Sequence, residues 1–558
     1  MQLGKKVTLT LLAAIISFNL VLRYPRGGHE LGVDSFFIHA LTGTIVSDGH
    51  AEWMLSPVSY FGWYPLSYPS AGPFLLASLN VMTGQSLEAS ILIMSILLGP
   101  MGILGAFMMA REFRVDNLLA LGVALIYGVA PRFLTFTLWT ASTRNLFMAL
   151  LPFLIWALLL NYRRKTLAHG IVLGLTLTIL TATHRLVILV LAFILAFLVA
   201  IMMLVVMRIL RIRIPKIVLQ NDVRRWTPYV ALALVGVISA GMLAGTDVLR
   251  EYSEGELGSG SSLSVQLLNL GVSIARSTGL ALPLVLVGIV VIARQRNKTI
   301  GEPFLVLTLL ALIPTLSLRQ YTGFYILPFL SIFGGLGIVG IVKAIRKRPR
   351  LSTATVGALV IAICLFSSYV LNVEVGRETA IEDHTYATAL YVRDMNAPGT
   401  MIANDGLTGV RVAAISGVRV LPIGGAGTTF QSPELLAYHF YSGNDVNIVR
   451  TDITSVTIES DSPWVATGLN AEEDWVGILE SPYGPLPPRL SSHYHPSYYL
   501  EVNQLAGSYF AYGHTYCSDL GLSVRGNAYR LYDNGVETVW WLYAPNIVPP
   551  RADGPRCP

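Results

Sequence analysis

The sequence predicts a polytopic α-helical membrane protein, with about 11 transmembrane helices, followed by a C-terminal extracytoplasmic α/β domain. Of its 558 residues, 53% are hydrophobic and 13% are charged, whereas about 25% of a soluble domain is charged. Apolar runs near the roughly 20 residues that cross a bilayer recur through the first two thirds of the chain. In lipid such runs must be helical, because every backbone polar group needs a partner within its own segment.

Eleven apolar runs define the expected membrane spans, and the basic residues between them indicate their direction. With the N-terminus in the cytoplasm, the inner loops hold 21 Lys and Arg residues and the outer loops of this region hold 8. The first run lacks a small-residue cleavage site, so we expect it to remain as an anchor. An odd number of spans places the C-terminal part outside, in a multi-pass protein of the plasma membrane. The runs lie at 7–23, 88–110, 117–137, 144–161, 166–183, 186–207, 228–246, 277–293, 302–318, 321–342 and 352–371.

The part of the chain after the last run differs in charge. Residues 372–558 carry 20 acids and 10 bases, whereas residues 1–371 carry 13 acids and 29 bases. Basic loops that face anionic lipid explain the excess of base, so the high pI does not indicate a nucleic acid partner. We therefore expect a transmembrane domain at 1–371, with a large first outer loop at 24–87, and a soluble domain at 372–558.

The start of the soluble domain alternates helical and strand patterns. DHTYATALYVRDMNA predicts a helix that ends before Pro398-Gly399, and TMIAND predicts the strand that follows. GLTGVRVAAISG then predicts a second helix, and VRVLPIG a second strand. No GxGxxG motif opens a helix after a strand, so no nucleotide site is predicted.

Metal and disulfide chemistry have little support in the sequence. Neither C-x-x-C nor H-E-x-x-H occurs, so no metal ligands are predicted, and a divalent metal cofactor stays open without support. Cys364 lies inside an expected span. A disulfide between Cys517 and Cys557 on the outer side is permitted, and their spacing does not decide it.

The first outer loop gathers several of the few acids of the membrane part, in the segment GVDSFFIHALTGTIVSDGHAEW. Phe37, Ile38, Leu41 and Ile45 recur at helical spacing, which predicts a helix lying in the membrane interface. Asp34 falls at or near the N-terminus of this helix. An aspartate there would cap the helix and complement its dipole, and a catalytic carboxylate is the alternative.

Three further side chains of this loop are candidates for an acceptor-binding or secondary acid role. His39 follows Asp34 by five residues, about 140° around a helix, so the two are not expected to form a dyad. Asp48 and Glu52 fall in the turn after the helix, where a solvated loop is the alternative interpretation. Local chemistry alone leaves the role of the loop undecided.

Basic side chains at the outer ends of several expected spans favour a functional interpretation. Snorkelling to the interface is the alternative for each, but charges at membrane depth usually pair or line a cavity. Arginine grips phosphate through charge-assisted, bidentate bonds. A carboxylate near such a clamp indicates group transfer from a lipid-linked phosphate, in which aspartate takes the proton of the acceptor. The candidate phosphate ligands are Arg132, Arg144, His184, Arg185, Arg276 and Arg319.

Four later segments accompany the first loop: WYPLSYPSAGPFLLA, TRNLFMALLPFLIWALLL, TATHRL and LRQYTGFYILPFLSIFGGLGI. With the loop and the soluble domain they resemble the GT-C superfamily of integral-membrane glycosyltransferases. The resemblance implies a polyprenyl-phosphate-linked sugar donor and transfer at the outer face to a protein, lipid or glycan. It also implies that Asp34 is the catalytic carboxylate and that arginines, Arg319 first among them, hold the donor phosphate.

Departures from two GT-C subfamilies limit what the resemblance implies. Oligosaccharyltransferase catalytic subunits carry a W-W-D-Y-G-type motif, whereas here Trp540-Trp541 is followed by Leu-Tyr. They also carry paired acids in a second outer loop, and PRFLTFTLWTASTRN has none. The adjacent Asp-Glu of protein O-mannosyltransferases is absent, because Ser35 follows Asp34. A monosaccharide transferase fits best; the alternatives are a non-catalytic GT-C-like assembly protein and a transporter or flippase of lipid-linked or anionic solutes.

Overall fold

The chain forms two compact units in the computed structural model. Unit 1 comprises Met1–Arg26, Ile93–Trp139 and Thr143–Glu378, and unit 2 comprises Gly27–Leu92, Thr140–Ser142 and Thr379–Pro558. The described residues are 3–25, 27–49, 71–184, 187, 189–209, 271, 274–275, 277–294, 300–312, 319–345, 354, 357–369, 381–395, 400–403, 406–422, 446–450, 456–460, 490–494, 498–502 and 528–542.

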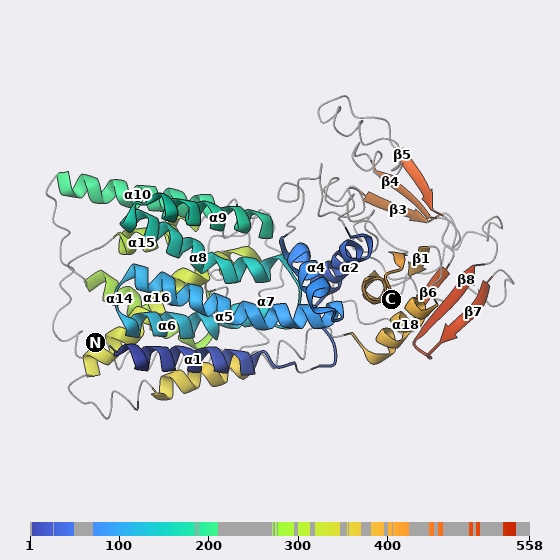
Figure 1. Ribbon diagram of the computed structural model, residues 1–558, viewed down its shortest axis with the longest axis horizontal. Coiled ribbons are helices and arrows are strands. Elements are labelled where there is room, and N and C mark those ends of the chain that lie inside the picture. The colour runs from blue at the N-terminus through green and yellow to red at the C-terminus, as the bar shows by residue number, and fades with distance from the viewer. Residues whose placement is uncertain are drawn as a thin grey trace. The chain divides into compact units, whose positions relative to one another are not determined.

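Unit 1 is helical, and its long helices lie side by side and roughly parallel (Figure 1). Among the residues that the structure describes, four helical stretches are long and apolar enough to cross a membrane: α1, α5, α8 and the part of α16 from Phe324 to Ala344. The chain is therefore a multi-pass membrane protein, while the number eleven and the orientation stay predictions. The predicted run at 228–246 lies outside the described residues. The helices of this unit are α1 (Lys5–Leu22), the greater part of α5 (Leu87–Phe113), α6 (Asn117–Gly128), α7 (Pro131–Thr137), α8 (Thr143–Arg164), α9 (Leu167–Thr183), α10 (Val190–Ile209), η2 (Gly279–Ala281), α14 (Leu282–Arg294), α15 (Gly301–Leu312) and α16 (Arg319–Ile345).

The run predicted as one span at 117–137 is broken. Helices α6 and α7 meet at a bend of 53°, and Pro131 is the first residue of α7. Proline lacks the N–H that would continue the helical ladder and disfavours helical backbone in the residue before it. Accordingly Ala130 has φ −60° and ψ 128°, outside the helical region. The hydropathy pattern shows only the apolar length and misses this change of direction.

A buried arginine joins three helices of unit 1 close to this bend. Arg23 follows α1 directly and is 2% exposed. Its Nε donates to Asn19 Oδ1 (2.8 Å), its Nη1 to Ser95 O (3.2 Å) and to the carbonyl of Thr137, and its Nη2 to Thr137 Oγ1 (2.6 Å). A Cβ at Gly99 would lie 2.2 Å from Asn19 Oδ1 and 2.4 Å from Arg23 Nε. Glycine at position 99 therefore makes room for the guanidinium.

Glycines also bring α14 and α16 together. A Cβ at Gly288 would lie 1.8 Å from the carbonyl oxygen of Phe333, and one at Gly337 would lie 2.1 Å from that of Leu284. Small residues allow helix backbones to approach closely, which is how membrane helices associate without a hydrophobic driving force between them. Any side chain at either position would push the two helices apart.

In its described residues, unit 2 combines helices with two sheets. The sheet β2-β1-β6-β8-β7 is mixed: β1 is parallel to β2 and β6, and β8 is antiparallel to β6 and β7. The sheet β3-β4-β5 is antiparallel. The predicted order helix, strand, helix, strand is present as α18, β1, α19 and β2. The elements are α2 (Val33–Asp48), α4 (Ala71–Thr83), α18 (Asp383–Asp394), β1 (Thr400–Ala403), α19 (Gly406–Ser416), β2 (Arg419–Pro422), β3 (Val446–Arg450), β4 (Val456–Ser460), β5 (Leu490–Tyr494), β6 (Tyr498–Val502), β7 (Ala528–Asp533) and β8 (Glu537–Leu542).

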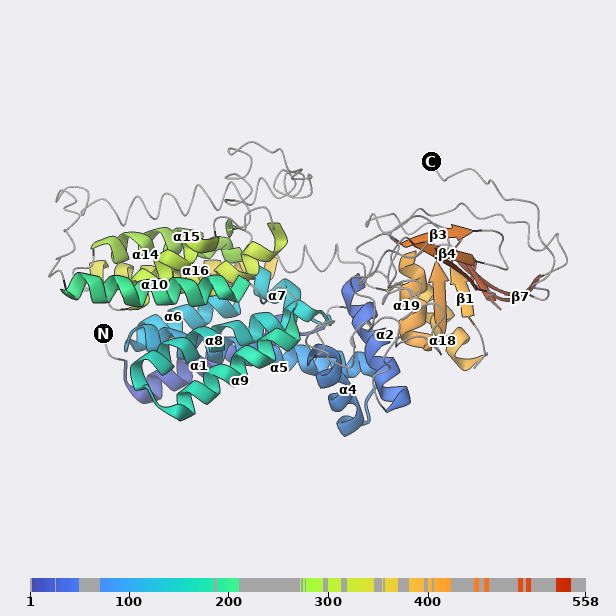
Figure 2. The same ribbon diagram turned by 90° about the horizontal axis from the view of Figure 1, so that it is seen from above.

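The first loop, predicted at 24–87 as part of the transmembrane domain, belongs to unit 2 from Gly27 onward. Helix α2 packs against α4 and α19, and α19 lies between α2 and β1 (Figure 2). Phe36 of α2 is buried with Ile381 and Ala414. Ile38 and Leu41, expected to face lipid, are also buried. The predicted helix is present, but these side chains are buried within the protein, where α2 packs against both α4 and α19.

Candidate functional site

Asp34 lies in the first turn of α2, at the second helical position. The N-cap is Gly32, which has a φ of 85° and a ψ of 149°. As a glycine, it makes no side-chain hydrogen bond to the helix. The expectation that Asp34 caps the helix is therefore wrong by position. A carboxylate in a first turn still complements the helix dipole. The side chain of Asp34 lies outside the described residues.

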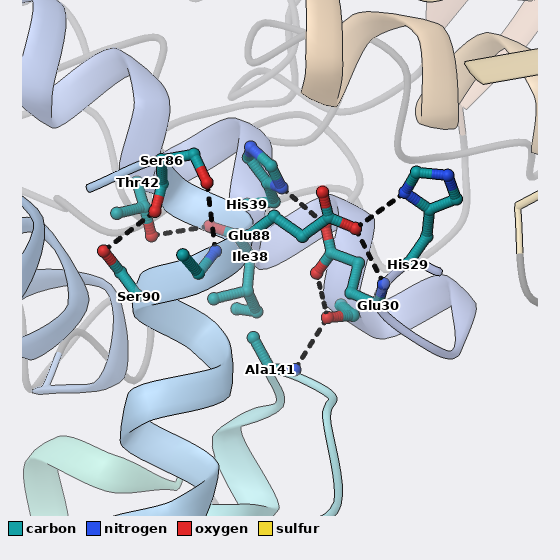
Figure 3. A network of polar contacts seen from close by, with 11 residues as sticks. His29, Glu30, Ile38, His39, Thr42, Ser86, Glu88, Ser90 and Ala141 are labelled. Atoms are coloured by element: carbon teal, nitrogen blue, oxygen red, sulfur yellow. Dashed lines mark hydrogen bonds and ion pairs between the residues drawn. The ribbon is translucent and has the colours of Figure 1, made fainter. Parts of the chain in front are cut away.

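The Glu30 carboxylate organises the polar contacts around this turn (Figure 3). Glu30 is 1% exposed. Its Oε2 accepts a 2.5 Å hydrogen bond from the Ser35 hydroxyl, and its Oε1 accepts one of 2.5 Å from Nδ1 of His39. The Ser35 Oγ in turn accepts the backbone N–H of Ala141 at 2.7 Å. One carboxylate thus binds two turns of α2, and Ser35 connects them to the backbone at Ala141.

A second carboxylate, that of Glu88 in the first turn of α5, fixes the backbone of Glu30. Glu88 Oε1 accepts the backbone N–H of Glu30 and the Nδ1–H of His29, each at 3.0 Å. The imidazole of His29 stacks on the ring of Tyr386 in α18, with 3.9 Å between ring centroids. These contacts connect the loop before α2 to both α5 and α18.

The charges of this cluster favour a protonated His39. Burial by itself lowers the pKa of this imidazole, but the adjacent Glu30 carboxylate, helped by Glu88, outweighs it and raises the pKa above the usual 6.5. Burial and then Glu88 also raise the pKa of the Tyr386 hydroxyl, against Arg393. Because a carboxylate only accepts hydrogen bonds, the proton on His39 Nδ1 belongs to the imidazole.

The acids that form this cluster are not the ones predicted from the sequence. Asp48 and Glu52 were predicted, but the side chain of Asp48, the last residue of α2, and the whole of Glu52 lie outside the described residues. His39 was predicted as well, and that residue is present as a donor to Glu30. Glu30 and Glu88 were missed. Their one signal in the sequence is that each stands at the edge of an apolar segment, where a carboxylate needs a partner.

In unit 1, two of the predicted arginines gather around one aromatic ring. The Cζ of Arg132 lies 5.7 Å from the ring centroid of Phe136, and that of Arg144 lies 5.6 Å from the same centroid. Arg132 is also 5.3 Å from the ring of Phe324, which meets Phe136 edge to face at 4.7 Å. Residues of α7, α8 and α16 therefore converge, with both guanidinium groups half-buried.

His184 borders the same part of α8 and α16. It is buried, directly follows α9, and lies 5.6 Å from the ring of Phe147. Phe147 lies 5.3 Å from the ring of Tyr325. Arg319 is the first residue of α16, and its side chain is outside the described part of the chain. Arg185 and Arg276 also fall outside it.

Metal ligands do not cluster in the part of the chain that the structure describes: it holds no group of three or more His, Cys, Asp or Glu residues placed to bind an ion. Cys364 is a free thiol there. Cys517 and Cys557, for which the sequence leaves a disulfide undecided, lie outside the described residues.

Comparison with known proteins identifies the fold. No protein-family model matches the chain, and no curated protein matches it in sequence. The apo oligosaccharyltransferase of Archaeoglobus fulgidus matches with a TM-score of 0.56 at 13% identity, over 98% of this chain and 75% of that one. AglB from the same organism, solved with an inhibitory peptide and a dolichol-phosphate, matches with a TM-score of 0.54 at 13% identity, over 97% and 74%.

A third solved structure is matched over its whole length. ArnT from Cupriavidus metallidurans, bound to undecaprenyl phosphate, matches with a TM-score of 0.52 at 11% identity, over 98% of this chain and 100% of that one. At such identities the matches speak for the fold. Over nearly its whole length, this chain has the fold of the GT-C membrane glycosyltransferases.

Proposed function

We propose that this protein is a membrane glycosyltransferase, which moves a sugar from a polyprenyl-phosphate donor to a lipid, glycan or protein acceptor at the outer face of the membrane. Two proteins of the same fold were solved with lipid phosphates, a dolichol-phosphate in AglB and undecaprenyl phosphate in ArnT. The donor class follows from that likeness together with the basic residues of unit 1.

The convergence of Arg132 and Arg144 on Phe136 is the observation that carries the proposal. The two guanidinium groups come from α7 and α8, and a phosphate bound at this point would accept charge-assisted hydrogen bonds from both. Guanidinium groups suit this role, because their planar forks pair with phosphate oxygens. The ring of Phe136 attracts both guanidinium groups and helps to orient them.

The reaction then assigns a task to each group. The Asp34 carboxylate takes the proton from a hydroxyl or amide of the acceptor, while the oxygen or nitrogen of that acceptor group attacks the anomeric carbon of the sugar. The bond from that carbon to the phosphate oxygen breaks, and its electron pair leaves with the polyprenyl phosphate. Arg132, Arg144 and Arg319 stabilise the charge that develops on this leaving group.

The test is the change Asp34→Asn in purified protein, with polyprenyl-phosphate sugars as donors. Asparagine has nearly the shape of aspartate but does not accept the proton. We expect transfer to fall about a hundredfold or more, the usual range for loss of a general base. Stability should change little, because a charge in the first turn contributes about 0.3–1 kcal/mol.

Asp48→Asn and Glu52→Gln are the matched controls, since both neutralise an acid of the same loop. We expect each to cost less activity than Asp34→Asn. Transfer at the wild-type rate by the Asp34→Asn protein would refute the role of Asp34. Wild-type protein that transfers no sugar from any polyprenyl-phosphate donor would refute the function and favour an assembly protein.

A further inference from the structure

The first turn of α2 is held by an unusual set of bonds. The N-cap residue, Gly32, has no side chain that could accept a hydrogen bond from the first backbone N–H groups of the helix. It therefore does not make the bond by which Ser, Thr, Asp or Asn commonly caps a helix. Instead the Ser35 hydroxyl donates a hydrogen bond to Glu30 Oε2, in the loop before the helix, and accepts one from the backbone N–H of Ala141. Asp34 stands directly before Ser35, so any motion of this turn would move both residues.

Glu30 reaches the next turn of α2 as well. Ser35 and His39 are four residues apart and therefore share one face of the helix. The two oxygens of Glu30 bond one each, and the backbone of Glu30 is held by Glu88. These residues form a clamp, defined here as Glu30, Ser35, His39 and Glu88.

We propose that Glu30 is a positioning residue for Asp34, and that the clamp is strongest while His39 is doubly protonated. The inference rests on the proposed function and adds a pH dependence to it. A carboxylate that must deliver its oxygen within hydrogen-bond reach of an acceptor loses much of its effect when displaced by 1 Å. Imidazolium gives Glu30 a charge-assisted bond, which is stronger than the neutral one.

The surroundings of His39 support this dependence. Among the described residues, the carboxylates of Glu30 and Glu88 are the charged groups that act on His39. The imidazole of His29 is hydrogen-bonded to Glu88. Helix α19 contributes Arg411, whose guanidinium lies over the ring of Phe36, and α18 contributes Tyr386. Helix α4 has no titratable side chain. The carboxylates next to His39 thus outnumber the nearby cations.

The first arm of the test needs no transfer assay. Thermal unfolding of full-length wild type and of His39→Gln is compared between pH 5.5 and 9. The pKa of His39 is raised on folding, so the stabilisation is fully present below the unfolded value of 6.5 and is lost as pH rises through the folded value. We expect the gap in melting temperature to be largest at low pH and to shrink at high pH. A gap that is constant across the range would overturn the dependence on His39.

The second arm measures transfer kinetics of Glu30→Gln and Ser35→Ala. Both should lower kcat about ten- to hundredfold, with the donor KM unchanged, because they misplace Asp34 without touching the donor. Ser90→Ala is the matched control, since Ser90 is an equally buried serine of α5 whose hydroxyl donates to the carbonyl of Ser86, just before that helix. It should keep wild-type kcat. Wild-type kcat in Glu30→Gln, or an equal loss in Ser90→Ala, would overturn the positioning role.

The two arms separate this inference from the proposed function. A flat stability gap with an inactive Asp34→Asn protein refutes the pH dependence and leaves the transferase standing. A pH-dependent gap in a wild-type protein that transfers nothing refutes the positioning role along with the transferase, and leaves the clamp as a structural device.

Discussion

Replacement of Arg23 by methionine would show whether the buried arginine network stabilises unit 1. Methionine keeps much of the side-chain length but removes the charge and every donor. The Asn19 side-chain oxygen, the Thr137 hydroxyl oxygen and the Thr137 carbonyl would each lose the bond that Arg23 now donates. The Ser95 carbonyl would lose one as well, but it lies inside α5 and has a helical N–H partner. A buried acceptor left unsatisfied costs about 1–3 kcal/mol. Three such acceptors cost about 3–9 kcal/mol.

Part of this cost is offset, because the charged guanidinium no longer has to be buried away from water. We therefore expect a net loss of about 2–4 kcal/mol. At about 2 °C per kcal/mol for a large domain, this is a fall in melting temperature of about 4–8 °C. Thermal unfolding of the detergent-purified protein, followed by intrinsic fluorescence, measures it directly.

Arg111→Met is the matched control, since Arg111 is exposed in the last turn of α5. Exposed substitutions usually change stability by no more than about 0.5 kcal/mol. Arg23→Lys should lie between wild type and Arg23→Met, because an ammonium keeps the charge but lacks the planar fork. Equal melting temperatures for Arg23→Met and Arg111→Met would refute the assignment of a stabilising role to the network.

Three other outcomes are expected. Reporters fused after Arg350 should read cytoplasmic and those after Glu374 outside, because inner loops carry most of the basic residues; the reverse at either point would contradict the topology and the outer-face site. Arg319→Lys should lower transfer sharply with folding intact if a planar fork grips phosphate, and equal turnover would reduce Arg319 to an anchor. Arg144→Gln should raise the donor KM about tenfold or more, since a charged hydrogen bond contributes about 1.5–3 kcal/mol; an unchanged KM would separate Arg144 from the donor.

Several features of the candidate site could be predicted because they depend on local sequence. The helix at 33–48 is visible from apolar residues at helical spacing, and the arginines at span ends from their cost in lipid. The convergence of Arg132 and Arg144 was anticipated as a possibility only, because hydropathy does not say which faces of α7 and α8 meet. Their shared contact with Phe136 comes from the packing of α7, α8 and α16.

Other features could not be predicted, because they depend on contacts between distant residues. Glu88 bonds the backbone of Glu30 from 58 residues further along the chain, and Ala141 bonds Ser35 across 106 residues. In the sequence Glu30 is an isolated acid. Only the fold turns it into the centre of a hydrogen-bonded cluster.

The sequence by itself determined that this is a multi-pass membrane protein, because a chain this apolar has to form helices that satisfy their own backbones in lipid. It also determined the helix and strand order from α18 to β2, through the local periods of 3.6 and 2. Tertiary structure decided the break between α6 and α7, the burial of Arg23 among carbonyls, and the packing of α2 against α19. Periodicity records which face of an element is apolar, whereas the partner that covers this face is chosen by the rest of the chain.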